Sequence, residues 1–339
     1  MTTPAQLLAL HSGDRAAFEL VVGPHLKGLK AHCYRMSGSW HEAEDLLQES
    51  LLRAWKGVST FRGESSLKTW LYTVTTHACL EQLEKRRVRT LPFALGPATP
   101  AEVGPFAPDL DRPWLEPMPG DPEDDAFSPE ARLSSKQSVA FAFLTLVQQL
   151  PPRQRAVLLL RDVLGFQASQ CAELLETSVA SVNSALQRAR ETMGESTRPA
   201  TRLEDEAERE LLGRYVRAWE KADVSGLLSL LVEGATLSMP PLSEWYEGRA
   251  AIGLQLAAMA LPPAAAGTRR FQLIRANAMP AVAVWKRDAA SGDFVAEAIQ
   301  VLELDGDHRV KAITAFLDTR LFAAFGLPQV QLLETLAPG

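Results

Sequence analysis

Cysteine is scarce in this sequence, and the arrangement of the few cysteines excludes two common uses of the residue. Cys33, Cys79 and Cys171 are an odd number, stand far apart and form no CxxC pair. A disulfide framework needs an even set, and a zinc site needs ligands at short, regular spacings. His77 and Cys79 lie two apart on a predicted helix and cannot face one ligand position together. The sequence therefore predicts no disulfides, no bound metal and no other cofactor.

A long apolar run is also missing. No stretch approaches the roughly 18 consecutive apolar residues that span a bilayer. The N-terminus, MTTPAQLLALHSGD, lacks the basic region and cleavage site of a secretory signal. Hydrophobic residues make up 46% of the 339 residues and charged residues 22%, which is an ordinary globular composition. We therefore expect a cytoplasmic protein with two or three domains and no membrane partner.

The chain as a whole has no excess of basic residues, since its formal net charge is −6 at pH 7. Taken globally, this balance argues against a nucleic-acid-binding protein. The charges are nevertheless separated along the sequence. Acidic residues concentrate at 109–130, whereas basic residues cluster at 85–89 and again at 188–198. Because screened charges act over a Debye length of about 8–10 Å, these segments can serve different partners.

The first strong pattern runs from 39 to 90 and begins with a helix. Ser39 followed by Glu42 is a capping box that predicts the helix start. The apolar stripe recurs every fourth residue: Ala43, Leu47, Leu51 and Trp55. The opposite side carries the polar row Asp45, Glu49 and Arg53. An ordinary solvated helix would also show this row, because a glutamate and an arginine four residues apart form a favourable pair.

A second helix is predicted from about 67 to 88. Its inward side is expected to be Leu67, Trp70, Leu71, Val74 and Ala78, and its outward side Thr69, Thr73, Thr76 and His77. Threonine is a mediocre helix former, so a row of hydroxyls leading into a basic end favours a surface for hydrogen bonding beside a polyanion. The macrodipole also favours cations at a helix C-terminus, and the basic end by itself leaves both interpretations open.

The runs EDLLQESLLRAW and FRGESSLKTWLY, followed by this basic end, closely resemble the promoter-melting domain of the extracytoplasmic-function group of sigma-70 RNA polymerase sigma factors. The resemblance implies that residues 1–90 bind the polymerase core and the minus-ten promoter element. The residues implied to dock on the polymerase clamp helices are Asp45, Gln48, Glu49 and Arg53. Those implied to bind minus-ten DNA are Phe61, Arg62, Glu64, Ser65, Thr73, His77, Lys85, Arg86 and Arg87.

This assignment makes chemical sense for the loop at 61–66. An extruded base needs an apolar wall and polar atoms for its pairing edge, and Phe61 with its polar neighbours can supply both. Many relatives carry Asn where this chain has His77, so the base preference at that position is left open.

Residues 91–133 form a predicted linker. Repeated Pro with Asp and Glu leaves neither helical nor alternating periodicity, which predicts an extended, self-repelling segment. In the sigma family such a linker threads toward the polymerase active centre, and the resemblance implies the same role here. A middle part that makes no contact is the alternative.

Residues 134–196 carry the second strong pattern, a helix-turn-helix. Its first helix is expected to bury Cys171, Ala172 and Leu175, its turn to be 176–178, and its second helix to bury Val182, Leu186, Ala189 and Met193. The outward residues of the second helix are Ser181, Asn183, Ser184, Gln187, Arg188 and Arg190. Such side chains read major-groove edges and anchor phosphates. Glu176 is unusual, because this turn generally places Gly at a positive φ.

The segment, with its lead-in LPPRQRAVLLLRDVLGF, resembles the sigma domain that binds the minus-thirty-five element. The resemblance implies base contacts for Asn183, Ser184, Gln187 and Arg188, and a backbone contact for Arg190.

Residues 204–339 predict an α+β domain. A helix is expected over 211–219 and another over 227–231, followed by strands at 235–239, 271–279, 282–286, 294–304 and 310–316, the last three antiparallel. Helices followed by such a meander resemble the cone-shaped SnoaL-like fold of the nuclear-transport-factor-like superfamily. The run MPPLSEWYEGRAAI is similar to the version fused to sigma factors. Candidate pocket residues are Trp219, Met239, Trp245 and Tyr246, although aromatic residues at such spacings are more often core.

We therefore predict a multidomain protein with two all-α domains followed by an α+β domain. The predicted function is that of a sigma-factor subunit, which binds core RNA polymerase and promoter DNA and carries a fused regulatory domain. No nucleophile with a base and an orienting partner is recognised, so the prediction is not an enzyme. The alternatives are a DNA-binding regulator that acts without polymerase, and a DNA-binding module fused to a ligand-binding or polyketide-cyclase-type enzymatic domain. A small-molecule ligand of the third domain is left open.

Overall fold

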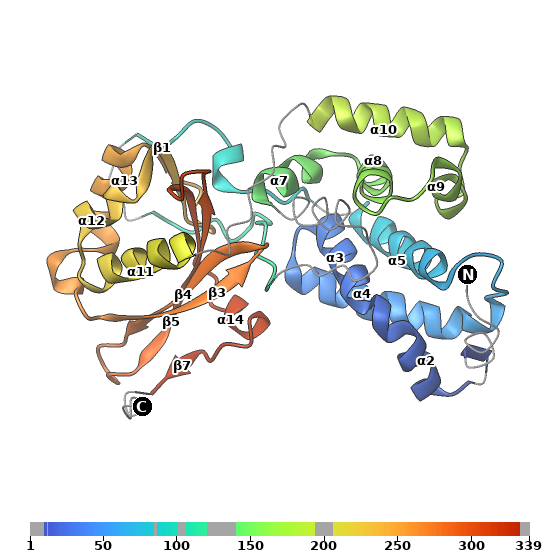
Figure 1. Ribbon diagram of the computed structural model, residues 1–339, viewed down its shortest axis with the longest axis horizontal. Coiled ribbons are helices and arrows are strands. Elements are labelled where there is room, and N and C mark those ends of the chain that lie inside the picture. Colours follow the sequence, from blue (N-terminus) through green and yellow to red (C-terminus); the bar gives the residue numbers. More distant parts are fainter. Residues whose placement is uncertain are drawn as a thin grey trace. The chain divides into compact units, whose positions relative to one another are not determined.

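The computed structural model describes residues 10–11, 13–84, 87–100, 106–120, 140–193 and 206–332. Two compact units make up the chain: residues 1–89 with 122–197, and residues 90–121 with 198–339. The first unit is all-α and the second combines helices with a sheet (Figure 1). The predictions for Lys85, Arg86 and the acidic positions after 120 lie outside the described residues.

The first helical region contains α2 (Arg15–Val22), α3 (Leu26–Ser37), α4 (Trp40–Gly57) and α5 (Leu67–Leu83). Local signals fix the ends of these helices. The Ser39 hydroxyl accepts from the Glu42 N–H at 3.1 Å, as the capping box predicts. The Ser66 hydroxyl accepts from the Thr69 N–H at 3.0 Å and starts α5 in the same way. Gly38 ends α3 at φ +74, a conformation that strains other residues.

The buried side of α4 differs from the predicted stripe. The fully buried residues are Ala43, Leu46, Ser50 and Ala54, whereas Leu47, Leu51 and Trp55 are half-buried. The reason is that α4 packs against both α3 and α5, so the buried arc is centred between these two neighbours. The Glu42 carboxylate accepts from Arg89 Nη2 at 2.6 Å.

The inward side of α5 also differs in part from the prediction. Leu67, Leu71 and Ala78 are buried as expected, but Trp70 and Val74 are half-buried. Thr76, predicted to face outward, is fully buried and its hydroxyl bonds with His32 Nε2 at 3.0 Å. A threonine can turn inward here because α3 supplies a partner for its hydroxyl.

The second helical region contains α7 (Phe141–Gln149), α8 (Pro152–Leu158), α9 (Ala168–Leu174) and α10 (Val179–Met193), with a π-helical turn at Leu159–Val163. The predicted helix-turn-helix is confirmed in α9 and α10. All the residues expected to face inward are buried: Cys171, Ala172, Leu175, Val182, Leu186, Ala189 and Met193. Glu176 has φ +50, so the turn adopts the left-handed conformation despite having no glycine.

The second unit has α11 (Glu206–Glu220), α12 (Val224–Ser229) and α13 (Arg249–Gln255) over one face of a curved sheet (Figure 1). The strands are β1 (Leu231–Ser238), β2 (Trp245–Glu247), β3 (Arg269–Ala276), β4 (Met279–Arg287), β5 (Phe294–Leu304), β6 (Val310–Phe316) and β7 (Val330–Gln331), and a short helix α14 (Leu321–Ala324) precedes β7. The sheet order is β2-β1-β6-β5-β4-β3, with β7 on β5. Strands β3 to β6 form an antiparallel meander, and β1 runs parallel to β6.

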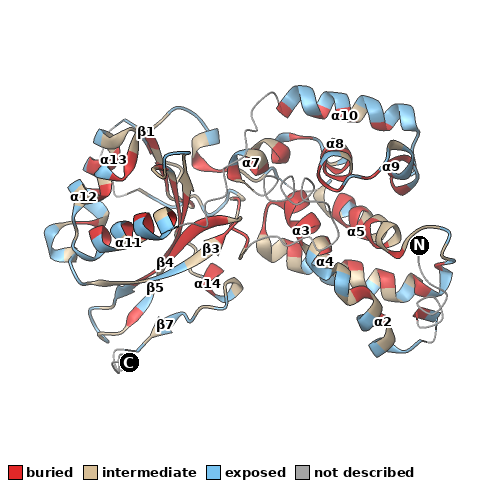
Figure 2. Cartoon of the chain, in the orientation of Figure 1, coloured by how far each residue is buried: buried red, intermediate tan, exposed pale blue. Residues whose placement is uncertain are grey.

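The predicted meander is confirmed, with two differences. Asn277 and Ala278 have φ values of +53 and +59, so the strand expected over 271–279 ends at 276 and turns into β4. Strands β2 and β7 were not predicted, because they are too short to show an alternating pattern. Buried residues fill the space between the helices and the sheet, as the distribution of burial shows (Figure 2).

The described part of the predicted linker is held by the second unit. The Thr99 N–H donates to the Trp245 carbonyl at 2.8 Å, and the Gly120 N–H donates to the Arg275 carbonyl at 2.9 Å. Between these points, Phe106 packs against the core of the unit. The alternative of a middle part that makes no contact is therefore wrong for the described residues. Composition predicts extension but does not detect a partner for the backbone groups that an extended chain leaves unpaired.

None of the described helices combines the length and apolar composition needed to cross a bilayer.

Candidate functional site

The polar face of α4 is the first candidate surface. Asp45 and Gln48 are exposed, and Glu49 is half-buried beside Arg53. Arg53 donates from Nε to Glu49 at 2.7 Å and from Nη1 to Glu81 of α5 at 2.8 Å. These two ion pairs fix the guanidinium, so the face presents its carboxylates and amide in a set arrangement. The exposure of Asp45 and Gln48 agrees with the predicted face, and its docking role stays a prediction.

An apolar side chain on the same face was missed by the sequence analysis. Leu52 follows Gln48 by four residues, which places the two on one side of the helix. Its exposed fraction is 55%, although it is a large hydrophobic residue. Leu52 directly follows Leu51, a member of the predicted apolar stripe, so the sequence did show an apolar residue here. The four-residue spacing of the stripe does not include position 52.

The loop between α4 and α5 only partly matches the predicted base pocket. Phe61 is 4% exposed and packs on Trp70 with ring centroids 5.0 Å apart. It therefore belongs to the core in this structure, and the prediction that it provides the pocket wall disagrees with its burial. Arg62 and Glu64 are exposed and Ser65 is half-buried, so the polar part of the loop is accessible.

The outward face of α5 is also less open than predicted. His77 is half-buried, and its Nε2 donates to the carbonyl of Leu174 in α9 at 2.7 Å. Thr73 is half-buried and its hydroxyl donates to the Thr69 carbonyl at 3.0 Å. At the end of the region, Arg87 is exposed. The structure thus brings the second helical region onto a face that the sequence assigned to DNA.

A buried histidine of α3 packs against α5. His32 lies between Thr76 and the Tyr72 ring, whose centroid is 5.4 Å from that of His32. Burial, with a smaller effect from Arg35, lowers the pKa of His32 to about 3. The imidazole is therefore neutral at physiological pH and acts as a hydrogen-bonding core residue.

The outer face of α10 is the second candidate surface. Every residue predicted to face outward is exposed: Ser181, Asn183, Ser184, Gln187, Arg188 and Arg190. The helix starts at Ser178, whose hydroxyl accepts from the Ser181 N–H at 3.1 Å. The Gln187 amide donates to Glu191 at 2.9 Å. The face therefore combines amides, hydroxyls and arginines on one exposed helix.

Arg190 differs from its neighbours because it already has an acidic partner. Its Nε and Nη2 donate to the two carboxylate oxygens of Asp162 at 2.9 and 2.7 Å. This hydrogen-bonded pair raises the pKa of Arg190 and sets the direction of the guanidinium. No local pattern points to this pair, since 28 residues separate its members.

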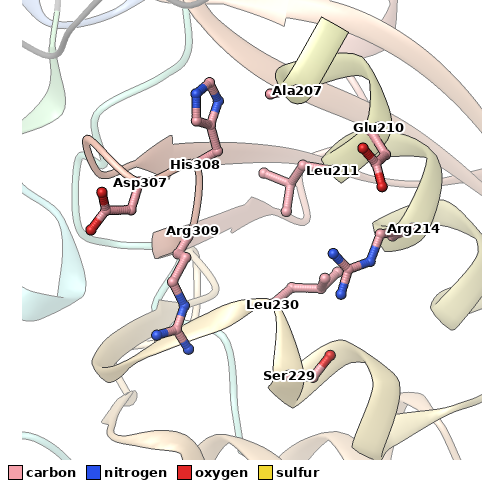
Figure 3. Close-up of a pocket in the computed structure, with 9 residues that line it drawn as sticks. All are labelled: Ala207, Glu210, Leu211, Arg214, Ser229, Leu230, Asp307, His308 and Arg309. Carbon is pink, nitrogen blue, oxygen red and sulfur yellow. The ribbon is translucent and has the colours of Figure 1, made fainter.

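The second unit contains an open cavity of about 370 Å³ between α11 and the turn that joins β5 to β6 (Figure 3). The lining residues are Ala207, Glu210, Leu211, Arg214, Ser229, Leu230, Asp307, His308 and Arg309. Leu211 and Leu230 are its buried apolar part, whereas acidic and basic side chains share the rim. Because the rim carries both signs of charge, the lining does not select one class of ligand.

The predicted pocket residues lie elsewhere. Trp219 and Tyr246 belong to the buried core of the unit, and Met239 packs against that core. The Trp245 indole N–H donates to the Gly96 carbonyl of the linker at 3.1 Å. Among the residues that the structure describes, no three His, Cys, Asp or Glu side chains gather as a metal site requires.

Two family models match the two helical regions. Residues 21–89 match Sigma-70 region 2, and residues 140–193 match Sigma-70, region 4. The chain is 43% identical over 320 residues to the ECF RNA polymerase sigma factor SigG of Mycobacterium tuberculosis, covering 93% of this chain and 85% of that protein. The chain belongs to the ECF RNA polymerase sigma factors. Its partners are therefore the RNA polymerase core and promoter DNA, and the prediction of a sigma-factor subunit is confirmed.

Other relatives match over a shorter length or more weakly. The ECF sigma factor SigM of Mycobacterium tuberculosis is 28% identical over 187 residues, which cover 55% of this sigma factor and 80% of SigM. The crystal structure of the Mycobacterium tuberculosis ECF sigma factor SigJ has a TM-score of 0.58 at 22% identity, and the match covers 92% of this chain and all of that one. The SigJ likeness supports the fold: helical sigma domains followed by a helix-and-sheet region consistent with a SnoaL-like fold.

Proposed function

We propose that this sigma factor binds its partners through three surfaces and is regulated by its second unit. The α4 face docks on the polymerase clamp helices through Asp45, Gln48, Glu49 and Arg53. The loop and α5 bind the minus-ten element, and the α10 face binds the minus-thirty-five element. The second unit has the regulatory role, because it holds the linker between the two promoter-binding regions. Transcription takes place in the bacterial cytoplasm, so we propose that location for the protein.

The α10 face supports the second promoter contact. Asn183, Gln187 and Arg188 are exposed along one side of the helix, where amides and a guanidinium can reach base edges in the major groove. Arg190 is directed by Asp162 and suits a phosphate, which needs charge and direction but no base-specific pattern. The aliphatic inward side keeps this helix rigid against α8 and α9.

The observation that supports a regulatory role is the docking of the linker on the second unit. The Met118 N–H donates to the Asn277 side-chain oxygen at 2.7 Å, and the Asn277 N–H donates back to the Met118 carbonyl at 2.9 Å. Further bonds join the linker to Trp245, Pro241 and Arg275. A linker held in this way is restricted in the path it takes between the two promoter-binding regions. We therefore assign the second unit a regulatory role that acts through the linker.

We propose that the second unit has no catalytic activity. ECF sigma factors are generally not enzymes, and among the described residues of this unit the cavity rim lacks a serine, cysteine or lysine paired with a base. The Ser229 hydroxyl, which lines the cavity, donates to the Gly226 carbonyl at 2.6 Å.

Removal of the second unit tests the regulatory proposal. Full-length protein and a chain ending at Thr201 are compared in transcription from one promoter with purified core polymerase. A coupling of about 1–2 kcal/mol predicts a several-fold difference in transcript yield at matched polymerase occupancy. Equal yields across a range of salt concentrations and temperatures would refute the regulatory role. The promoter-binding assignments would then be unaffected.

A further inference from the structure

The face of α5 that should meet DNA is in contact with the second helical region of the same unit (Figure 1). His77 donates to the Leu174 carbonyl at 2.7 Å. Tyr72 lies five residues before His77 on the same helix. Its ring packs edge-on against Phe166, with ring centroids 5.6 Å apart. Tyr72 and Phe166 are both buried. Of these residues His77 is the one assigned to DNA, and its Nε2 is occupied by the Leu174 carbonyl while α9 remains in place.

A buried guanidinium holds the two helical regions together beside this face. Arg155 of α8 donates to the Met36 carbonyl at the end of α3 and also to Gln148 of α7. The Gln148 amide donates in turn to the Arg35 carbonyl at 3.0 Å. Arg155 is 4% exposed, and burial lowers its pKa to about 10. The interface is therefore a specific polar network and not a loose apolar contact.

Promoter geometry is incompatible with this arrangement. The minus-ten and minus-thirty-five elements are separated by 25 positions, which is roughly 85 Å of duplex at about 3.4 Å per base pair. Two regions joined by hydrogen bonds cannot occupy both elements at once. The first unit must open before the sigma factor reads a complete promoter.

We propose that α9 and the minus-ten DNA compete for one face of α5, and that His77 is the residue that fastens α9 to it. This inference rests on the proposed assignment of that face to the minus-ten element. It gives His77 a positioning role in the free protein, which is distinct from any contact with a base after opening.

The end of α9 explains why a histidine suits this role. A helix leaves its last carbonyls without partners in the helix. The Ala172 and Glu173 carbonyls accept from the Thr177 and Glu176 N–H groups of the turn. The next carbonyl, that of Leu174, accepts from His77. His77 thus completes the cap at the end of α9, the helix that precedes α10. The bond that closes the first unit therefore also stabilises the first helix of the helix-turn-helix.

A matched pair of substitutions separates this bond from other roles of the side chain. In His77→Gln the amide nitrogen lies about as far from the backbone as Nε2, so the bond to the Leu174 carbonyl is kept. In His77→Asn the amide nitrogen lies closer to the backbone and cannot span the gap. Both variants carry an amide that is able to contact a base, and both are first checked for an unchanged thermal unfolding midpoint.

Opening is measured as a distance in the full-length protein. Spin labels are placed at exposed positions of the two regions by Ser59→Cys and Thr192→Cys, since the three native cysteines are buried. Electron–electron double resonance then gives the populations of short and long distances. The probe is a short single-stranded DNA with the minus-ten sequence of a promoter selected from a random library by transcription with the holoenzyme.

We expect His77→Asn to raise the ratio of open to closed protein by about three- to tenfold, the net effect of one hydrogen bond, and His77→Gln to resemble the wild type. Adding the probe should deplete the short distance in the wild type, because a ligand shifts the equilibrium toward the state that binds it. Equal populations in the two variants would overturn the role of His77. Probe binding that leaves the short distance unchanged would overturn the competition.

Transcription with core polymerase and the selected promoter is run on the same preparations, together with Arg62→Ala. Loss of probe binding in Arg62→Ala tests the minus-ten assignment by itself. If Arg62→Ala binds the probe normally, the proposed minus-ten surface formed by the loop and α5 fails, whatever the distances show. If the minus-ten assignment holds and the distance populations are the same in the two His77 variants, only the closure inference fails.

Discussion

The turn between β3 and β4 provides a direct test of linker docking. Asn277 is 1% exposed, and its side-chain oxygen is the acceptor for the Met118 N–H at 2.7 Å. Its φ is +53, which glycine adopts without strain. Asn277→Gly therefore removes the side chain while keeping the turn. The Met118 N–H is then buried without this partner, at a cost of about 1–3 kcal/mol.

This cost translates into a measurable exchange rate. Hydrogen exchange at the Met118 amide should become about 5- to 150-fold faster in Asn277→Gly, because each 1.4 kcal/mol is a factor of about ten in the opening equilibrium. Asn277→Asp is the matched control, since it keeps an acceptor oxygen and tolerates the left-handed conformation. An amide that exchanges in wild-type protein as fast as in an unstructured peptide would refute the docked linker, and so would an unchanged rate in Asn277→Gly.

The remaining predictions concern the other surfaces. Asp45→Arg should weaken binding to core polymerase with folding unaffected, because charge reversal at an exposed position introduces repulsion, and Glu49→Arg should weaken it too while also losing the ion pair with Arg53; unchanged affinity in competition binding would contradict the docking face. Gln187→Ala should relax base preference across a randomised minus-thirty-five element, whereas Arg190→Ala should weaken binding to all sequences and flatten the salt dependence; matching profiles would rule out this division. The pKa of His32 is lowered to about 3, so below pH 6.5 the unfolded chain binds a proton that the folded chain does not. The free energy of unfolding should therefore fall by up to about 1.4 kcal/mol per pH unit between pH 6.5 and 3, and urea denaturation of His32→Gln should lack this component of the slope.

The sequence by itself determined the elements whose signals are local. The inward residues of α10 follow from helical periodicity, because one helix face packs on α8 and α9 whatever the rest of the chain does. Ser39 fixed the start of α4 through its own hydroxyl. The antiparallel order of β4, β5 and β6 followed from short turns, since neighbouring strands joined by tight turns pair with each other.

The tertiary structure decided how those elements are used. Helical spacing placed Thr76 outward, and the family resemblance placed Phe61 in a base pocket. In the structure, His32 covers Thr76 and Trp70 covers Phe61. The linker composition predicted an extended, self-repelling segment and could not show that its backbone finds partners in the second unit. The His77 bond joins residues 97 apart in sequence. Such contacts depend on how whole elements pack, and local periodicity carries no information about a partner that lies far away along the chain.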